Sequence, residues 1–173
     1  MKRMLIALVL VLTLACTLTS CGLQVPRPEI KEGRFDFSIT YEIFGEVNTL
    51  SATYVCEFDG TSWSLEGGSY SRDWVDYVEG NYEGDDYSAK IGTTDDGGDI
   101  WLFFGIYPEY FMGDPEIGDR GIPEPMLYIS YPEDETGGMG YNGVQEDIAE
   151  RYGAKIISYE YANPLDNEFA VFN

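Results

Sequence analysis

Two stretches near the start of the chain alternate between apolar and polar residues. Residues 35–43 place their apolar side chains at odd positions, and residues 50–58 place them at even positions. A period of two puts successive side chains on opposite faces of an extended strand, with one face buried and the other in solvent. Because only a short segment containing Gly45 and Glu46 separates the two runs, they predict an antiparallel hairpin.

Five later segments also have the composition of strands, namely residues 87–93, 100–107, 126–131, 154–161 and 169–172. The apolar runs at 101–104 and 126–129 predict central strands covered on both faces. One helix is predicted near residues 143–152, with Asn142 as its cap and Gly153 after its end. This pattern predicts an all-β, mostly antiparallel, β-sandwich-like single domain with one short helix, and the alternative is one sheet with that helix on a face.

The N-terminus has the features of an export signal. Lys2 and Arg3 precede an apolar run at residues 4–14 that is too short to span a bilayer as a permanent helix. The tetrapeptide Leu18-Thr19-Ser20-Cys21 then looks like a bacterial lipobox, in which the Cys is lipidated before cleavage. We therefore expect a signal-peptide helix at residues 1–20, while an ordinary secretory signal and an uncleaved anchor remain the alternatives.

Lipidation of Cys21 would attach the protein to the extracytoplasmic face of the cell membrane, because two acyl chains anchor a protein durably and one does not. Residues 21–32 are polar and rich in Pro, which predicts an extended tether, and residues 33–173 then form the domain. Cys16 would leave with the signal peptide. Cys56 therefore has no disulfide partner in its own chain, and its place on the apolar face of a strand predicts a buried, unreactive thiol.

The charge and composition of the chain exclude several functions. A formal charge of -21 makes nucleic acid an unsuitable partner and prevents charge-driven binding to anionic lipid. The sequence contains no His, so Ser-His-Asp, Cys-His and His-containing zinc sites cannot be built. No catalytic residue, cofactor or metal site is predicted.

The many acidic residues still allow two chemical hypotheses. Residues 95–99, with the order Asp-Asp-Gly-Gly-Asp, could bind calcium, but they do not match an EF-hand and are typical of a tight turn between strands. Residues 114–119 form a second acidic loop with the same interpretation. A pair of carboxylates could also hydrolyse a glycoside, although no particular pair stands out and a small sheet domain leaves little room for a deep cleft.

Aromatic residues are dense between residues 59 and 86, a region with many Gly and little periodicity. Such rings could form a flat binding platform for a glycan or for a partner's apolar side chains. The alternative is that they fold back and close the end of the sandwich, which is the commoner role of large aromatic residues under long loops and which a short helix over residues 71–78 would favour. The candidate binding residues are Trp63, Tyr70, Trp74, Tyr77 and Tyr82.

Several segments, spread over most of the mature chain, resemble the sequences of a known group of proteins. They are the lipobox, residues 28–33 (PEIKEG), the hairpin, residues 108–115 (PEYFMGDP) and residues 152–158 (YGAKIIS). Together they resemble a group of small uncharacterised lipoproteins of Gram-positive anaerobic bacteria. The resemblance implies a location and no mechanism. We therefore expect a lipid-anchored, non-catalytic binding module whose ligand is a glycan, a peptide or another envelope protein, with a glycan-processing enzyme or a calcium-binding surface protein as alternatives.

Overall fold

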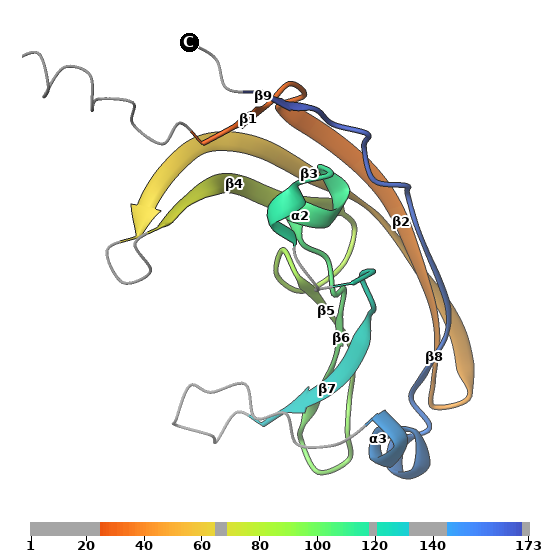
Figure 1. Ribbon diagram of the computed structural model, residues 1–173. Helices are drawn as coiled ribbons and strands as arrows, with labels where there is room; N and C mark the ends of the chain where they lie inside the picture. Colours follow the sequence, from red (N-terminus) through yellow and green to blue (C-terminus); the bar gives the residue numbers. More distant parts are fainter. Residues whose placement is uncertain (1–24, 65–68, 118–120, 132–144, 171–173) are drawn as a thin grey trace, which may run out of the picture.

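The structure is a computed structural model that describes residues 25–64, 69–117, 121–131 and 145–170, and it is an all-β fold built mainly from antiparallel strands. The larger sheet has the strand order β4-β3-β2-β8. Its strands are β2 (Glu32–Ile43), β3 (Glu46–Ser64), β4 (Ser69–Gly80) and β8 (Lys155–Tyr161). This sheet is strongly curved, and its concave side encloses the rest of the molecule (Figure 1).

A three-stranded sheet lies within that curve, with the order β5-β6-β7. Its strands are β5 (Ser88–Thr93), β6 (Asp99–Phe103) and β7 (Met126–Ser130). Two further short strands, β1 (Arg27–Pro28) and β9 (Phe169–Ala170), pair with each other near the two ends of the described chain. The two larger sheets face each other across one core, as the sandwich-like pattern predicts.

The predicted hairpin is confirmed. Strands β2 and β3 pair antiparallel from Glu32 opposite Glu57 to Ile43 opposite Glu46. The odd-numbered apolar residues of β2 lie on the concave face, and the buried β3 residue Cys56 shares that face. Cys56 is fully buried, as predicted from its register.

The core lies between the curved sheet and the small sheet, and one helix closes it at the end near β1 and β9 (Figure 1). That helix, α2 (Pro108–Phe111), inserts Phe111 between two rings of the large sheet. The Phe111 ring centroid is 5.0 Å from that of Phe35 and 5.3 Å from that of Tyr54. Edge-on and tilted ring contacts of this kind add stability beyond the area they bury.

The predicted C-terminal helix is confirmed as α3 (Gln145–Tyr152). It packs Ile148, which is 1% exposed, against the core and ends at Gly153 with a positive φ of 62°. A left-handed residue after the last turn is a common helix ending that Gly adopts without strain. The predicted cap Asn142 lies outside the described residues.

The short helix considered for residues 71–78 does not form, because these residues are the middle of strand β4. Strand β4 pairs with β3 over twelve register positions, from Ala52 opposite Gly80 to Ser64 opposite Ser69. The segment is rich in Val and aromatic residues, which favour strands, and its helical spacing of Trp74 and Val78 was coincidental. Antiparallel pairing with the preceding strand β3 therefore decided its conformation.

The later strands appear where they were predicted, but β6 is shorter than expected and its faces are less covered. It ends at Phe103, since Gly105 turns the chain with a φ of 66° towards α2. Ile100 and Leu102 are fully buried, whereas Trp101 on the opposite face of β6 is half-buried. β6 is the central strand of its sheet, as predicted, whereas β7, for which a central position was also expected, lies at the edge.

The segment predicted as a tether joins the fold before residue 33. Pro28 of β1 is fully buried and pairs with Phe169, and β2 begins at Glu32. Among the described helices, none is long and apolar enough to cross a membrane.

Candidate functional site

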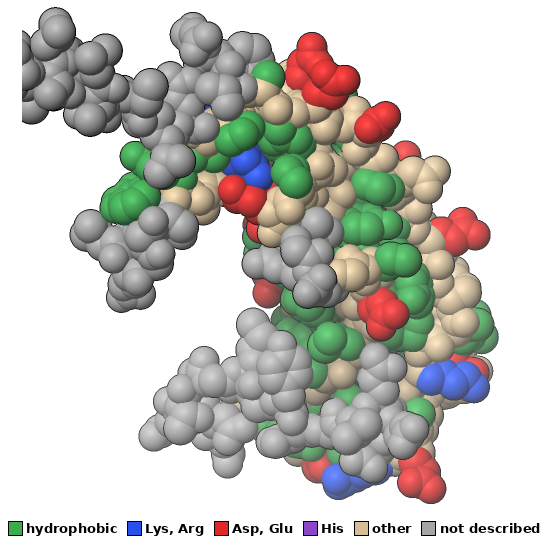
Figure 2. Space-filling model, in the orientation of Figure 1, with side chains coloured by type: hydrophobic (Ala, Val, Ile, Leu, Met, Phe, Trp, Pro, Cys, Tyr) green, Lys and Arg blue, Asp and Glu red, His purple; other side chains and the backbone are tan. Residues whose placement is uncertain are grey.

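Two of the predicted binding residues, Trp63 and Tyr70, form an exposed aromatic pair at the end of the β3–β4 hairpin where the chain passes from β3 to β4. Their ring centroids are 4.6 Å apart at an interplanar angle of 60°. Trp63 is 46% exposed and Tyr70 is 41% exposed. They face each other because Trp63 is opposite Tyr70 in the strand register. Figure 2 shows hydrophobic side chains at the free end of this arm.

The third aromatic residue, Trp74, lies further along the same face and is half-buried. Its ring packs edge-on against Phe58 at 5.5 Å between centroids. Its indole Nε1 donates a hydrogen bond to Asp114 Oδ2 at 3.1 Å. Trp74 therefore serves the core and a buried polar cluster.

The last two predicted residues belong to neither group. Tyr77 is opposite Val55 in the strand register. Successive side chains of a strand point to opposite faces, so Tyr77 lies on the other face of the sheet from Trp74 and Val78. Tyr82 follows β4, packs edge-on against Phe104 at 5.4 Å and donates a hydrogen bond to the carbonyl oxygen of Asp85. The structure thus brings Trp63 and Tyr70 together and does not join all five rings in one platform.

Sequence reasoning missed a buried ion pair between Arg72 and Asp114. The side chains of both residues are almost completely buried, at 3% and 0% exposed. Arg72 Nη1 also donates to the carbonyl oxygen of Pro26 at 3.0 Å, and its guanidinium lies 4.8 Å from the Phe169 ring centroid. Arg72 of β4 therefore contacts the loop after α2, Pro26 just before β1 and Phe169 of β9.

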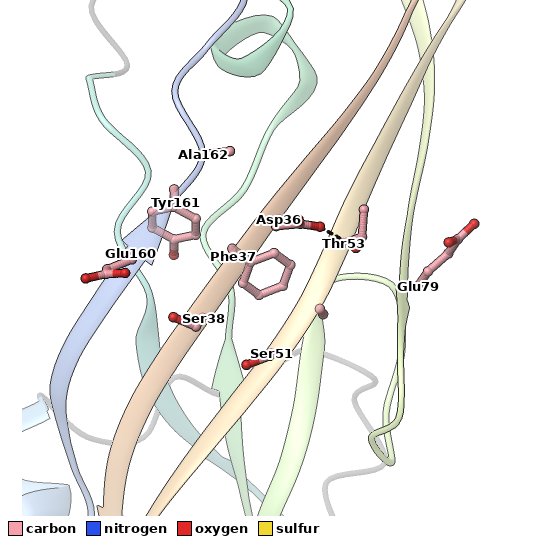
Figure 3. Close-up of a pocket in the computed structure, with 10 residues that line it drawn as sticks. Asp36, Phe37, Ser38, Ser51, Thr53, Glu79, Glu160, Tyr161 and Ala162 are labelled. Carbon is pink, nitrogen blue, oxygen red and sulfur yellow. Dashed lines mark hydrogen bonds between the residues drawn. The ribbon is translucent and has the colours of Figure 1, made fainter.

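The outer face of the large sheet carries an open polar groove of about 660 Å³ (Figure 3). Its polar side chains come from the four strands β2, β3, β4 and β8. On β2, Asp36 and Ser38 lie on the outer face because they alternate with the buried Phe35 and Phe37. These polar side chains are Asp36, Ser38, Ser51, Thr53, Glu79 and Glu160. The groove therefore offers three carboxylates and three hydroxyl groups.

The hydrogen bonds in the groove leave much of its acceptor capacity directed to solvent. Thr53 Oγ1 donates to Asp36 Oδ1 at 2.7 Å near the centre, and Glu79 and Glu160 lie on either side (Figure 3). Arg34 forms an ion pair with Glu79. All three carboxylates belong to exposed residues. A surface of this kind accepts hydrogen bonds from a cationic or hydroxyl-rich ligand.

Glycoside hydrolysis needs a different arrangement of acids. A general acid for that reaction is a carboxyl group held in an apolar pocket opposite a second carboxylate. The groove is open, and its three acids lie on an exposed sheet face. The groove therefore lacks the enclosed apolar pocket that this reaction needs for its general acid.

The acidic segment 95–99 forms the turn between β5 and β6, as predicted. Gly97 has a φ of 88°, and its N–H donates to the carbonyl oxygen of Thr94. Asp96 accepts hydrogen bonds from Thr94, Tyr131 and Tyr152 and pairs with Arg151 at 3.1 Å. The Thr94 hydrogen bond, followed by the charge of Arg151, lowers the pKa of the Asp96 carboxyl. Over the described ranges, no three His, Cys, Asp or Glu side chains are grouped to hold a metal ion.

Cys56 lies in a buried environment that suppresses its reactivity. Burial raises the pKa of the Cys56 thiol to about 12, and the charges of Asp76 and Glu109 act in the same direction. The neighbouring Tyr54 donates a hydrogen bond to Asp76 Oδ2 at 2.6 Å, and burial also raises its pKa. The thiolate is the reactive form, so this site is unsuited to nucleophilic chemistry at neutral pH.

The fold and the groove define the class of this protein as an all-β domain with an open polar face. No protein-family model matches the chain, and no curated protein or solved structure is significantly similar to it.

Proposed function

We propose that the protein is a lipid-anchored binding module on the extracytoplasmic face of the cell membrane, held by acyl chains on Cys21. The export signal and the lipobox-like residues 18–21 support the location. The observation that carries the binding role is the open groove, where carboxylates from three strands share one solvent face. Its preferred ligand is a cationic segment of a peptide or envelope protein.

Charge complementarity supports this choice of ligand. The chain has a formal charge of -21, and three of its exposed carboxylates line the groove, where Arg34 pairs with Glu79. An acidic field of this kind raises the encounter rate with basic partners and disfavours acidic ones. Hydroxyl groups from Ser38, Ser51 and Thr53 would add neutral hydrogen bonds to the bound segment.

The location is tested by fractionating cells that express Cys21→Ala. We expect this variant to leave the membrane fraction, because it lacks the sulfur that carries the lipid. Cys16→Ala is the matched control, since that residue lies in the predicted signal peptide and its loss should change nothing. Membrane association of Cys21→Ala equal to that of the wild type would contradict the anchor.

The binding role is tested by thermal shift of the detergent-solubilised full protein with octalysine and with neutral oligosaccharides. Octalysine should raise the melting temperature of the wild type, because a ligand that binds only the native state stabilises it. The triple variant Asp36→Asn, Glu79→Gln, Glu160→Gln should lose most of this shift.

A second triple variant separates groove binding from general attraction. It carries Glu46→Gln, Glu150→Gln and Asp166→Asn, which remove the same amount of charge at exposed residues outside the groove. This control should keep the shift. Equal losses in both variants would contradict the groove, and a shift only with oligosaccharides would show that the ligand is a glycan.

A further inference from the structure

We propose that Trp63 and Tyr70 dock the anchored domain on the membrane by placing their rings among uncharged or zwitterionic lipid headgroups. The proposal rests on the lipid anchor of the proposed function and adds a second contact between the protein and the bilayer. It also fixes an orientation, with the Trp63–Tyr70 end of the β3–β4 hairpin towards the lipid.

The chemistry of the pair suits this environment. Both rings are more than two-fifths exposed although they contact each other at 4.6 Å between centroids. Trp and Tyr have an apolar body and one polar group, and they concentrate at the boundary between headgroups and acyl chains for that reason. An exposed pair of these residues is therefore suited to the interface.

The described start of the chain lies beside this hairpin. The carbonyl oxygen of Pro26 accepts a hydrogen bond from Arg72 Nη1 at 3.0 Å. Tyr70 precedes Arg72 by two positions in the same strand, which is about 7 Å along β4. Figure 1 shows β1 on the same side of the molecule as the free end of the hairpin.

The length of chain before Pro26 limits how far the membrane can be. Cys21 precedes Pro26 by five positions, which span at most about 18 Å when fully extended. By contrast, β3 is 19 residues long, so the β2–β3 turn at its other end is about 60 Å away along the strand. A lipid on Cys21 therefore holds the aromatic end of the sheet near the bilayer and leaves the other end in solvent.

The charges around the pair give no attraction to anionic lipid. The whole chain is strongly acidic and is repelled by anionic lipid, and residues 61–71 contain a single charged residue, Glu66. Ser62, next to Trp63, donates a hydrogen bond to the Asp73 carboxylate at 2.8 Å. The positive charge of Arg72 is offset by Asp114 and Glu116. Docking would therefore depend on the rings and would require no anionic lipid.

The anchor makes a contact of two rings effective. Two interfacial side chains bind a membrane weakly when the protein diffuses freely. Once Cys21 is inserted, the second contact is intramolecular and occurs at a high effective concentration. The tether is short, so little freedom remains to be lost on docking.

The test uses the full lipidated protein in phosphatidylcholine vesicles, with and without brominated acyl chains that quench nearby tryptophan fluorescence. The chain has three Trp, and both others, Trp74 and Trp101, are half-buried and donate hydrogen bonds to Asp114 and Ser130. We expect brominated lipid to quench the wild type, Trp63→Phe to abolish the quenching, and Trp101→Phe to retain it.

A relocated indole provides a second, independent variant. Phe44, in the β2–β3 turn, is 57% exposed, so Phe44→Trp combined with Trp63→Phe moves the exposed indole to the other end of the sheet. This double variant should show no quenching. Quenching of the double variant equal to that of the wild type would overturn the proposed orientation.

The remaining outcomes separate this inference from the proposed function. Vesicle-bound wild-type protein without quenching, or quenching unchanged by Trp63→Phe, overturns the docking and leaves the anchor intact. Protein that does not associate with vesicles at all overturns both.

Discussion

The guanidinium of Arg72 forms two parallel hydrogen bonds with the carboxylate of Asp114, from Nε to Oδ2 at 2.7 Å and from Nη2 to Oδ1 at 2.5 Å. The two residues are 42 positions apart and both side chains are almost inaccessible to solvent. Asp114 also accepts from Trp74 Nε1 and from the Glu116 N–H, so its oxygens are well provided with donors. This cluster holds the hairpin arm against the loop after α2.

Breaking this pair on one side should destabilise the protein strongly. Arg72→Met should lower the free energy of unfolding by about 3–5 kcal/mol, because it leaves the buried Asp114 charge without its ion-pair partner. Asp114→Leu should cost less, because Glu116 Oε1 remains 3.2 Å from Arg72 Nη2. The double variant should recover a large part of the loss, since an apolar pair of similar volume avoids desolvating two charges. Urea denaturation of the three variants measures this. Single variants within about 1 kcal/mol of the wild type would contradict the role of the pair.

The Cys56 thiol should resist modification in the native protein. Its pKa of about 12 leaves roughly one molecule in ten thousand as thiolate at pH 8, and the side chain is fully buried. We expect slow labelling by iodoacetamide in buffer and rapid labelling in urea, with mass spectrometry locating the label on Cys56. Equal rates in both conditions would mean that the β2–β3 core opens readily.

The Asp96 carboxylate should make stability depend on pH in the acid range. Its pKa is lower in the folded protein than the ordinary value of 3.8, so its contribution is present above that value and is lost as the pH falls through the folded pKa. Asp96→Asn should therefore be less stable than the wild type at pH 7 and should approach it as the pH falls below the folded pKa of Asp96.

Urea midpoints across this pH range measure the effect, with the exposed neighbour variant Asp95→Asn as the control. Salt should reduce the difference between Asp96→Asn and the wild type, because part of it comes from the charge of Arg151. A difference that is unchanged between pH 7 and pH 3 would show that the carboxylate charge has no role.

Two glycines with positive φ should differ in their tolerance of a side chain. Gly105 has a φ of 66°, and a Cβ there would lie 1.9 Å from the carbonyl oxygen of Glu124. Gly97 has a φ of 88° with nothing within 4 Å of its Cβ position. Gly97→Ala should cost about 1–2 kcal/mol from backbone strain alone.

Gly105→Ala should cost roughly 2 kcal/mol more than the Gly97 variant, because the main chain at Glu124 must also move. Thermal unfolding of the two variants compares them directly. Equal costs would indicate that the loop around Glu124 adjusts freely.

Local patterns predicted the elements whose periodicity fits only one type of secondary structure. The alternation in residues 35–43 and 50–58 predicted β2, β3 and the burial of Cys56, since a strand with one buried face repeats every two residues. The helix at Gln145–Tyr152 was also predicted from periodicity and its terminal Gly. Strand β4 was not, because Trp74 and Val78 are equally compatible with a helix until β3 pairs with the segment.

The groove and the buried ion pair depend on residues that the sequence separates widely. Asp36, Glu79 and Glu160 share a face only because β8 adds to β2 and β4 adds to β3 in particular registers. A shift of one residue in any of these strands would turn its carboxylate to the other face.

The amino-acid sequence by itself determined the strand-forming segments, the excess of negative charge and the lack of imidazole chemistry, since these follow from residue type and spacing. Only the tertiary structure decided that Trp63 and Tyr70 meet in solvent beside the chain leading to Cys21, while Trp74 packs inside. The reason is that cross-strand register and sheet curvature arise from contacts between distant segments, which no local pattern encodes.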